Sequence, residues 1–128
     1  MKNLQILIGN LGADPKVVKF DNGDQVAKFS LATSETWKDK QSGEVKTNTQ
    51  WHHIIAQKQL STVAERFLKK GSKVYIEGVT RHRSYISEGN ERNITEVYVR
   101  DLKLLSPHDK ETTPLDNMKS KNNNTGKE

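Results

Sequence analysis

The sequence predicts an all-β fold with one helix, closed as a small barrel and followed by a disordered C-terminal tail. Apolar and polar residues alternate over most of residues 1–105, which is the period of a half-buried strand. A single segment, residues 60–68, follows the period of an amphipathic helix instead. Only 32% of the 128 residues are apolar, and a small barrel suits that limit because side chains from a few strands fill it.

The strands before the helix are bounded by turn signals. Leu4, Ile6 and Ile8 alternate and predict a first strand, which the two glycines of 9–12 end in a bend or bulge. A hairpin is predicted at 21–23, where the Asn-Gly pair accepts positive φ. The other strands predicted in this half are 27–31 and 47–56, and a polar loop over 38–46 projects between them. A short, mostly apolar segment over 17–20 precedes the hairpin turn and is not counted as a strand of the barrel.

A stripe at helical spacing predicts the helix from Leu60, Val63, Ala64, Phe67 and Leu68. Thr62 and Glu65 have the spacing of a capping box, with an earlier start of the helix as the alternative. Lys69, Lys70 and Gly71 are expected to end the helix, because cations favour the negative end of its dipole and glycine suits the C′ position.

Two long strands follow the helix, over 74–85 and 92–105, and a turn at 88–90 separates them. Three strands, a helix and two strands is the element order of a five-stranded OB-fold barrel. The sequence therefore predicts an OB-fold domain over 1–105.

The charge of the chain lies in this domain. Residues 1–105 carry 17 Lys/Arg and 12 Asp/Glu, which gives the whole net charge of +5, and residues 106–128 carry four of each. The second segment has few large apolar residues, so it cannot offset its ordering entropy and is predicted to be a disordered tail. A basic domain indicates an anionic partner, with nucleic acid as the first candidate.

Several classes of protein are not expected from this sequence. It has no cysteine, which suits a reducing compartment, and no signal peptide or membrane-spanning run, so a cytoplasmic protein without a membrane partner is predicted. His52 and His53 are adjacent and point to opposite faces of a strand, so no metal site is expected. The carboxylates are scattered and no nucleophile motif occurs, so we expect no catalytic residues, no cofactor and no enzymatic activity.

Alternation assigns the faces of the strands that carry aromatic and basic residues. After the helix, Val74, Ile76 and Gly78 share a core face, and the opposite face carries Tyr75, Glu77, Arg81, Arg83 and Tyr85. In the preceding strand Trp51 and His53 share a face opposite His52 and Ile54. A core position for Trp51 and a merely solvated face for the arginines are the alternatives.

Trp37 stands among polar neighbours beside a basic loop that contains Lys38, Lys40 and Lys46. Aromatic rings interleaved with cations are what a single nucleic-acid strand requires, because bases stack on the rings and cations follow the phosphates. The pattern predicts a binding groove.

Five blocks occur in order along residues 1–105: ILIGNLGADP at 6–15, FSLATSETW at 29–37, TQWH at 49–52, LKKGSKVYIEG at 68–78 and TEVYV at 95–99. Together they resemble bacterial single-stranded-DNA-binding proteins. The resemblance implies an OB fold, sequence-independent binding of single-stranded DNA in replication, recombination, repair or DNA transfer, and a nucleoid-associated homotetramer. A dimer is the alternative.

The resemblance also implies roles for individual residues. Stacking on bases is expected of Trp37, Trp51 and Tyr85, whereas Gln57 stands where the family has a stacking phenylalanine. His52 matches a residue of the family's subunit interface. Contact with phosphate is expected of Lys40, His53, Lys70, Lys73, Arg81 and Arg83, of which Lys40 is placed by its basic loop and His53 stands where the family often has arginine.

The chain departs from the family at its end. The family typically finishes in a short acidic peptide with Ile-Pro-Phe that recruits replication and repair enzymes, and 124–128 reads Asn-Thr-Gly-Lys-Glu. Recruitment by that route is not expected. Two other functions stay open: an OB-fold adaptor of the primosome type that binds a protein, and a nuclease on the same barrel, which requires clustered carboxylates for a metal.

Overall fold

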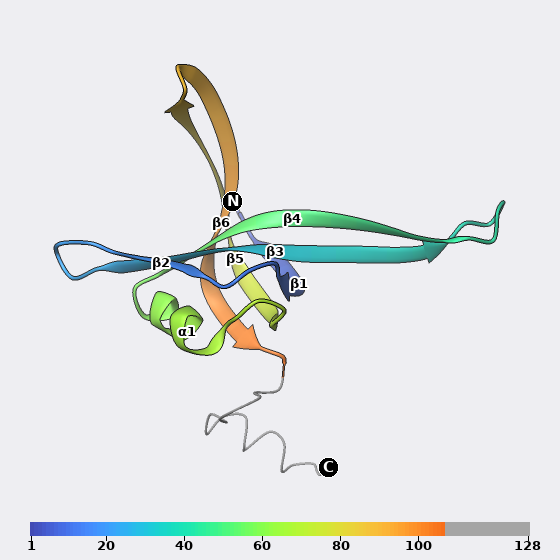
Figure 1. The fold of residues 1–128 in the computed structure, drawn as a ribbon, viewed down its shortest axis with the longest axis horizontal. Coiled ribbons are helices and arrows are strands. Elements are labelled where there is room, and N and C mark those ends of the chain that lie inside the picture. The colour runs from blue at the N-terminus through green and yellow to red at the C-terminus, as the bar shows by residue number, and fades with distance from the viewer. Residues whose placement is uncertain (107–128) are drawn as a thin grey trace, which may run out of the picture.

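Strands dominate residues 1–106, and this part of the chain has one short helix between the fourth strand and the fifth (Figure 1). The computed structural model describes residues 1–106, so the predicted tail beyond Ser106 lies outside the described residues. The elements are β1 (Gln5–Leu11), β2 (Lys16–Lys19), β3 (Gln25–Lys38), β4 (Val45–Gln57), α1 (Gln59–Phe67), β5 (Lys73–Ser87) and β6 (Asn90–Leu104).

The strands close into the predicted five-stranded barrel. Their order in the sheet is β1-β5-β6-β4-β3-β2, and an additional pairing of β1 with β3 closes the ring. β4 and β6 run parallel and the other pairs are antiparallel. β2 lies outside the ring as an extension along β3, and its hairpin turns at Gly23, which has the positive φ that the sequence predicts.

Barrel closure depends on a glycine in β1. This strand pairs with β5 over Gln5–Asn10 and passes to β3 at Asn10 and Leu11. At Gly9 an added Cβ would lie 2.1 Å from the carbonyl oxygen of Ala32 in β3. Only glycine allows the two backbones to approach this closely.

The core contains alternate residues of the strands and the buried face of the helix: Leu7, Leu11, Ala27, Phe29, Leu31, Ile54, Ala56, Ala64, Leu68, Val74, Ile76, Val97 and Val99. β1 is apolar on both faces. Leu4, Ile6 and Ile8, the residues whose alternation predicts this strand, are 53%, 50% and 51% exposed. They lie on the outside of the barrel, and Leu7 and Leu11 fill its interior.

The helix begins and ends differently from the capping signals. It begins at Gln59, after Lys58 with φ 55°, and no side chain caps it, so the capping box is wrong and the earlier start is right. Leu68 is already extended, and Gly71 takes its φ of 89° in the following turn, where its N–H bonds to the carbonyl of Leu11. Gly71 is therefore not the C′ residue. Among residues 1–106 no helix is long and apolar enough to cross a membrane.

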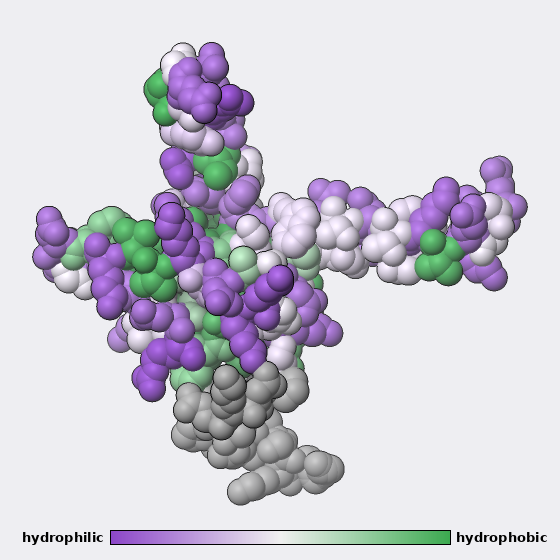
Figure 2. All heavy atoms as spheres, viewed as in Figure 1, coloured by the Kyte–Doolittle hydropathy of each residue, from purple (hydrophilic) through white to green (hydrophobic). Residues whose placement is uncertain are grey.

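Three hairpins project from the barrel, formed by β2–β3, β3–β4 and β5–β6 (Figure 1). Pairing continues to Lys38 and Val45 in the second hairpin and to Ser87 and Asn90 in the third. The third hairpin turns at 88–89, where both residues have positive φ. Figure 2 shows that the two longer hairpins are mainly polar, with small apolar spots.

Candidate nucleic-acid interface

Trp51 and His53 lie on the outer face of β4, which runs between β3 and β6. Ile54 of the same strand points into the core. The register places His53 opposite Ser30 of β3 on one side and Glu96 of β6 on the other. We call the outer surface of β3, β4, β6 and β5 the outer wall. Its members are Ser30, Ala32, Trp51, His53, Ile55, Arg81, Arg83, Glu96 and Tyr98.

The ring of Trp51 rests on a glycine. It is 58% exposed, and a Cβ added at Gly12 would lie 2.6 Å from its Cζ3 atom. The segment after β1 therefore supports one side of the indole and leaves the rest to solvent. An indole held in this way presents a flat apolar surface on which a base can stack.

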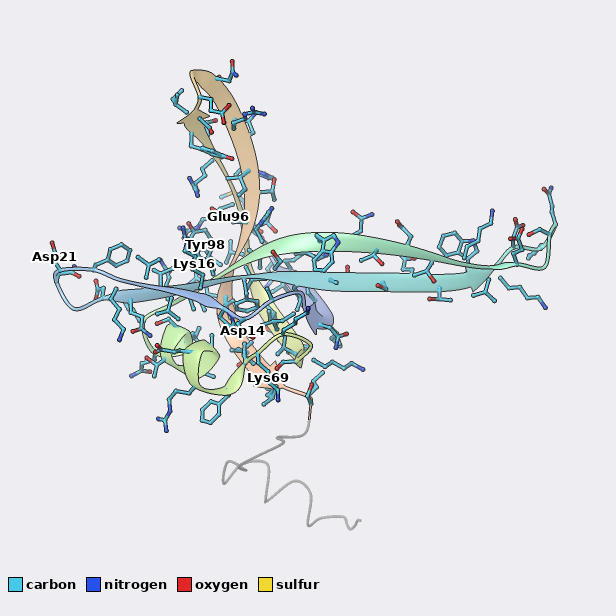
Figure 3. All side chains as sticks on the ribbon, in the orientation of Figure 1. Asp14, Lys16, Asp21, Lys69, Glu96 and Tyr98 are labelled. Atoms are coloured by element: carbon cyan, nitrogen blue, oxygen red, sulfur yellow. The ribbon has the colours of Figure 1, made fainter. Side chains whose placement is uncertain are left out.

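Lys73 lies in the same row of side chains as Trp51. It pairs with Asn10 of β1, which pairs with Ala32 of β3, which in turn pairs with Trp51. Three strand separations of about 4.8 Å place the two backbones on the order of 14 Å apart around the barrel. Lys70 lies in the turn before β5, where its backbone N–H bonds to the Asp14 carboxylate at 2.8 Å, and Figure 3 shows Asp14 beside this connection.

Arg81 and Arg83 extend from β5 over β6. The Nε atom of Arg83 is 2.9 Å from Oε1 of Glu96, and its Nη2 atom is 3.3 Å from Oε2. Glu96 is only 3% exposed, and its hydrogen bond raises the pKa of Arg83. The guanidinium of Arg81 lies over the ring of Tyr98, 4.5 Å from its centre. Figure 3 shows Glu96 and Tyr98 at the base of the β5–β6 hairpin.

Glu96 and Tyr98 were not among the predicted site residues. Alternation along 95–99 places both on the outer face of β6, so their face was within reach of the sequence. The arginines that contact them could not be predicted in this way, because each arginine contacts the β6 residue two positions beyond the one directly opposite it. Arg81 pairs with Glu96 and Arg83 pairs with Ile94.

Trp37 and Lys40 belong to the β3–β4 hairpin, away from the barrel. Trp37 is 48% exposed and pairs with Lys46, whose Nζ atom is 3.3 Å from Oδ2 of Asp39. The N–H of Gln41, and then Lys46, lower the pKa of Asp39. By alternation along β4, Lys46 and therefore Trp37 point to the face opposite that of Trp51. The two indoles thus lie on different faces of one ribbon.

Tyr85 is exposed on the β5–β6 hairpin, and its ring centre is 5.6 Å from the Cζ atom of Arg83. It shares a strand face with Arg81 and Arg83, as alternation predicts. The outer wall and this hairpin therefore bring together Trp51, His53, Tyr85 and the two arginines. They leave Lys40 at the tip of the other hairpin.

His52 points away from the outer wall. It is half-buried, pairs with the core residue Leu31, and its Nε2 atom is 2.8 Å from Oγ1 of Thr33. Burial, and secondly the charge of His53, lower the pKa of His52 below its usual value. Within residues 1–106, no three His, Asp or Glu side chains group as ligands for a metal ion.

A closed five-stranded barrel that exposes aromatic rings and cations on its outer wall and its hairpins defines the class of OB-fold nucleic-acid-binding proteins. The chain belongs to the single-strand binding protein family, whose model matches residues 2–105.

The solved structures similar to this chain include two single-stranded-DNA-binding proteins. The single-stranded-DNA-binding protein of Plasmodium falciparum, solved in complex with single-stranded DNA, has a TM-score of 0.74 and 33% sequence identity, over 83% of this chain and 96% of that one. A deletion mutant of the single-stranded-DNA-binding protein of Thermus aquaticus has a TM-score of 0.69 and 22% identity, over 82% of this chain and 51% of that one. The second likeness supports the fold alone.

Proposed function

We propose that this chain binds and protects single-stranded DNA without sequence preference, as a binding protein and not as an enzyme. The observation that carries the proposal is the exposure of both tryptophans, Trp37 and Trp51, on a basic domain of the single-strand binding protein family. Exposed indoles gain by stacking on bases, each worth about 1–3 kcal/mol, and every base offers a π-face. Binding by stacking is therefore tolerant of sequence.

The placement of the cations supports a path for the strand along the outer wall. From Trp51, Lys73 lies in the row toward β1 and β5, and His53 lies two residues along β4, opposite Glu96 and next to the arginines. Phosphates that follow these groups release condensed counterions, so the affinity falls as salt rises. Tyr85 extends the path onto the β5–β6 hairpin, and a strand that passes to the opposite face of the β3–β4 hairpin reaches Trp37 and Lys40.

The process that the protein serves follows from the ligand. A protein that covers single strands acts wherever the duplex is opened, in replication, recombination, repair or DNA transfer. We place it in the cytoplasm, a compartment that the cysteine-free sequence suits.

We propose further that the chain forms a homo-oligomer, the homotetramer that the family resemblance implies, with a dimer as the alternative. β1 pairs with β5 along Gln5–Asn10, and it meets β3 only at Asn10 and Leu11, so its other edge is open over Gln5–Gly9. Leu4, Ile6 and Ile8 expose half of their surface on the same strand. An open edge beside an apolar face is a template for pairing with a second copy. His52 remains a predicted interface residue.

Titration with poly(dT) tests the binding proposal. Tryptophan emission is followed at low and high salt, with duplex DNA as the control and with Trp37→Phe and Trp51→Phe variants to separate the two signals. We expect strong quenching by the single strand alone, and a plot of log affinity against log salt with a slope of about −0.7 per phosphate neutralised. Normal folding without quenching or binding would refute the proposal and favour the adaptor function, and cleavage of the strand with magnesium would favour the nuclease.

A further inference from the structure

The two arginines of β5 have different environments. Glu96 lies directly opposite Arg81 in the register, yet its carboxylate is bound by Arg83, two residues farther along β5. The guanidinium of Arg81 lies instead over the ring of Tyr98, at 4.5 Å from the ring centre. Both side chains therefore lean along β6 in the same direction, one onto a carboxylate and the other onto a ring.

The Arg81–Tyr98 stack stands in the middle of the outer wall. Tyr98 is half-buried and pairs with Val79 of β5 on one side and with Ile55 of β4 on the other. Ile55 is buried although its side chain points outward. The ring thus rests in a packed patch, which fixes it as a base for the exposed guanidinium of Arg81.

A guanidinium that lies flat on an aromatic ring has one covered face and one free face. The group is planar, is hydrated more weakly than an ammonium, and stacks on rings. Nucleobases stack on guanidinium planes as they do on aromatic side chains. A plane that is held flat before binding loses less rotamer freedom when a base arrives.

We propose that Arg81 is a base-stacking residue, that a nucleobase of the bound single strand lies on the free face of its guanidinium, and that Tyr98 is the positioning residue that holds this plane. The inference rests on the proposed function, since it concerns a subsite of the same interface. It changes the role of Arg81 from that of a charge near phosphate to that of a surface for a base. Arg83 keeps a different role, because the buried carboxylate of Glu96 takes two of its donors.

A substitution that conserves charge separates the two roles of Arg81. Arg81→Lys keeps the positive charge and removes the plane. If a base stacks on Arg81, this variant binds poly(dT) about ten-fold more weakly, with an unchanged dependence of affinity on salt. Arg81→Ala also removes the plane and weakens binding to a similar extent with an unchanged salt dependence, whereas loss of a phosphate contact would make that dependence shallower.

Variants of Tyr98 test the positioning role. Tyr98→Phe keeps the ring and binds as the wild type, and Tyr98→Leu removes it and weakens binding to the same extent as Arg81→Lys. The double variant is no weaker than either single variant, because both changes remove one stack. Arg66→Lys is the matched control: Arg66 lies over Phe67 at 5.5 Å on α1, off the outer wall, and its substitution leaves binding unchanged.

The outcomes distinguish this inference from the proposed function. Wild-type quenching by poly(dT) with Arg81→Lys equal to wild type would refute the stack and return Arg81 to phosphate contact. Absence of binding by a folded wild type would refute the proposed function itself. If Tyr98→Leu does not fold, the comparison of Arg81→Lys with the wild type and Arg66→Lys decides the question.

Discussion

Gly12 determines how the ring of Trp51 lies on the outer wall. Its φ is not in the left-handed region, so the backbone accepts alanine, but the added methyl would stand 2.6 Å from the indole. We predict that Gly12→Ala displaces the ring and weakens binding of poly(dT) by about ten-fold, the loss of one stacked base. In a Trp37→Phe background the emission reports Trp51 alone, and its wavelength shifts. An unshifted emission with full affinity would contradict this prediction.

His52 gives the stability a pH dependence. Burial first, and the charge of His53 second, lower its pKa in the folded chain below the usual value of about 6.5. As the pH falls, the unfolded chain is therefore protonated first. The contribution of His52 to the free energy of unfolding is therefore fully present above about pH 6.5. It decreases as the pH falls below that value, until the histidine of the folded chain is also protonated.

Denaturant unfolding at pH 7.5 and pH 5.0 measures this dependence at a fixed protein concentration. We expect a smaller loss between the two values in His52→Gln than in the wild type, because that variant lacks the titrating group. His82→Gln is the matched control, since it removes another histidine hydrogen-bonded to a threonine and keeps His52. Equal losses in the wild type and His52→Gln would exclude His52 as the source.

The sequence predicted the face to which a single side chain points wherever that face follows from alternation along a strand. Trp51 and His53 lie on the outer face and Ile54 is buried because a strand alternates its side chains without regard to the rest of the fold. The burial of Glu96 could not be predicted from the sequence, because it depends on Arg83, which binds the carboxylate from the neighbouring strand. No local pattern carries such a contact.

At the scale of the element, the two partners of the ion pair in the β5–β6 hairpin differ in their exposure to solvent. Glu96 is buried and Arg83 is half-exposed, so Arg83→Ala leaves a buried carboxylate without its partner, whereas Glu96→Gln leaves an arginine that reaches water. We predict that Arg83→Ala lowers the melting temperature by several degrees and that Glu96→Gln lowers it less. Calorimetry at one concentration measures both, and the reverse order would show that the carboxylate is not held by this pair.

The boundaries of the helix show where local signals fail. The capping box at Thr62 and the glycine at C′ are signals for the ends of an isolated helix. In this protein tertiary contacts set the ends of the helix instead. Ser61, fully buried, donates its hydroxyl to the carbonyl of Lys58, and Leu68 leaves the helix to enter the core. Gly71 has the positive φ expected of it, but uses it to bring its N–H to Leu11 of β1.

At the scale of the whole molecule, the barrel was predictable because its element order and its strand periods agree. The outward apolar face of β1 was not, because a strand that is apolar on both faces has no preferred inside. The closure at Gly9 decides the matter, since β1 meets β3 with Leu7 and Leu11 inward. Leu4, Ile6 and Ile8 are left on the outside, beside an open edge.

This face yields the prediction for the assembly. Ile8→Lys places a charge in the centre of the apolar face of β1, where burial of an unpaired ammonium is costly. We expect the proposed assembly to lose this contact and dissociate into smaller species at micromolar concentration, as sedimentation velocity measures directly. The matched control is Val45→Lys, because Val45 is also an exposed apolar residue but lies at the start of β4, far out on a projecting hairpin.

The same pair of variants links assembly to binding. A strand that contacts several subunits gains affinity from their effective concentration, so the smaller species formed by Ile8→Lys binds long poly(dT) more weakly and short oligonucleotides nearly as well as the wild type. Val45→Lys keeps the mass of the wild type. If Ile8→Lys keeps that mass too, the open edge of β1 is not the contact between subunits, and the assembly has to be sought on another face of the barrel.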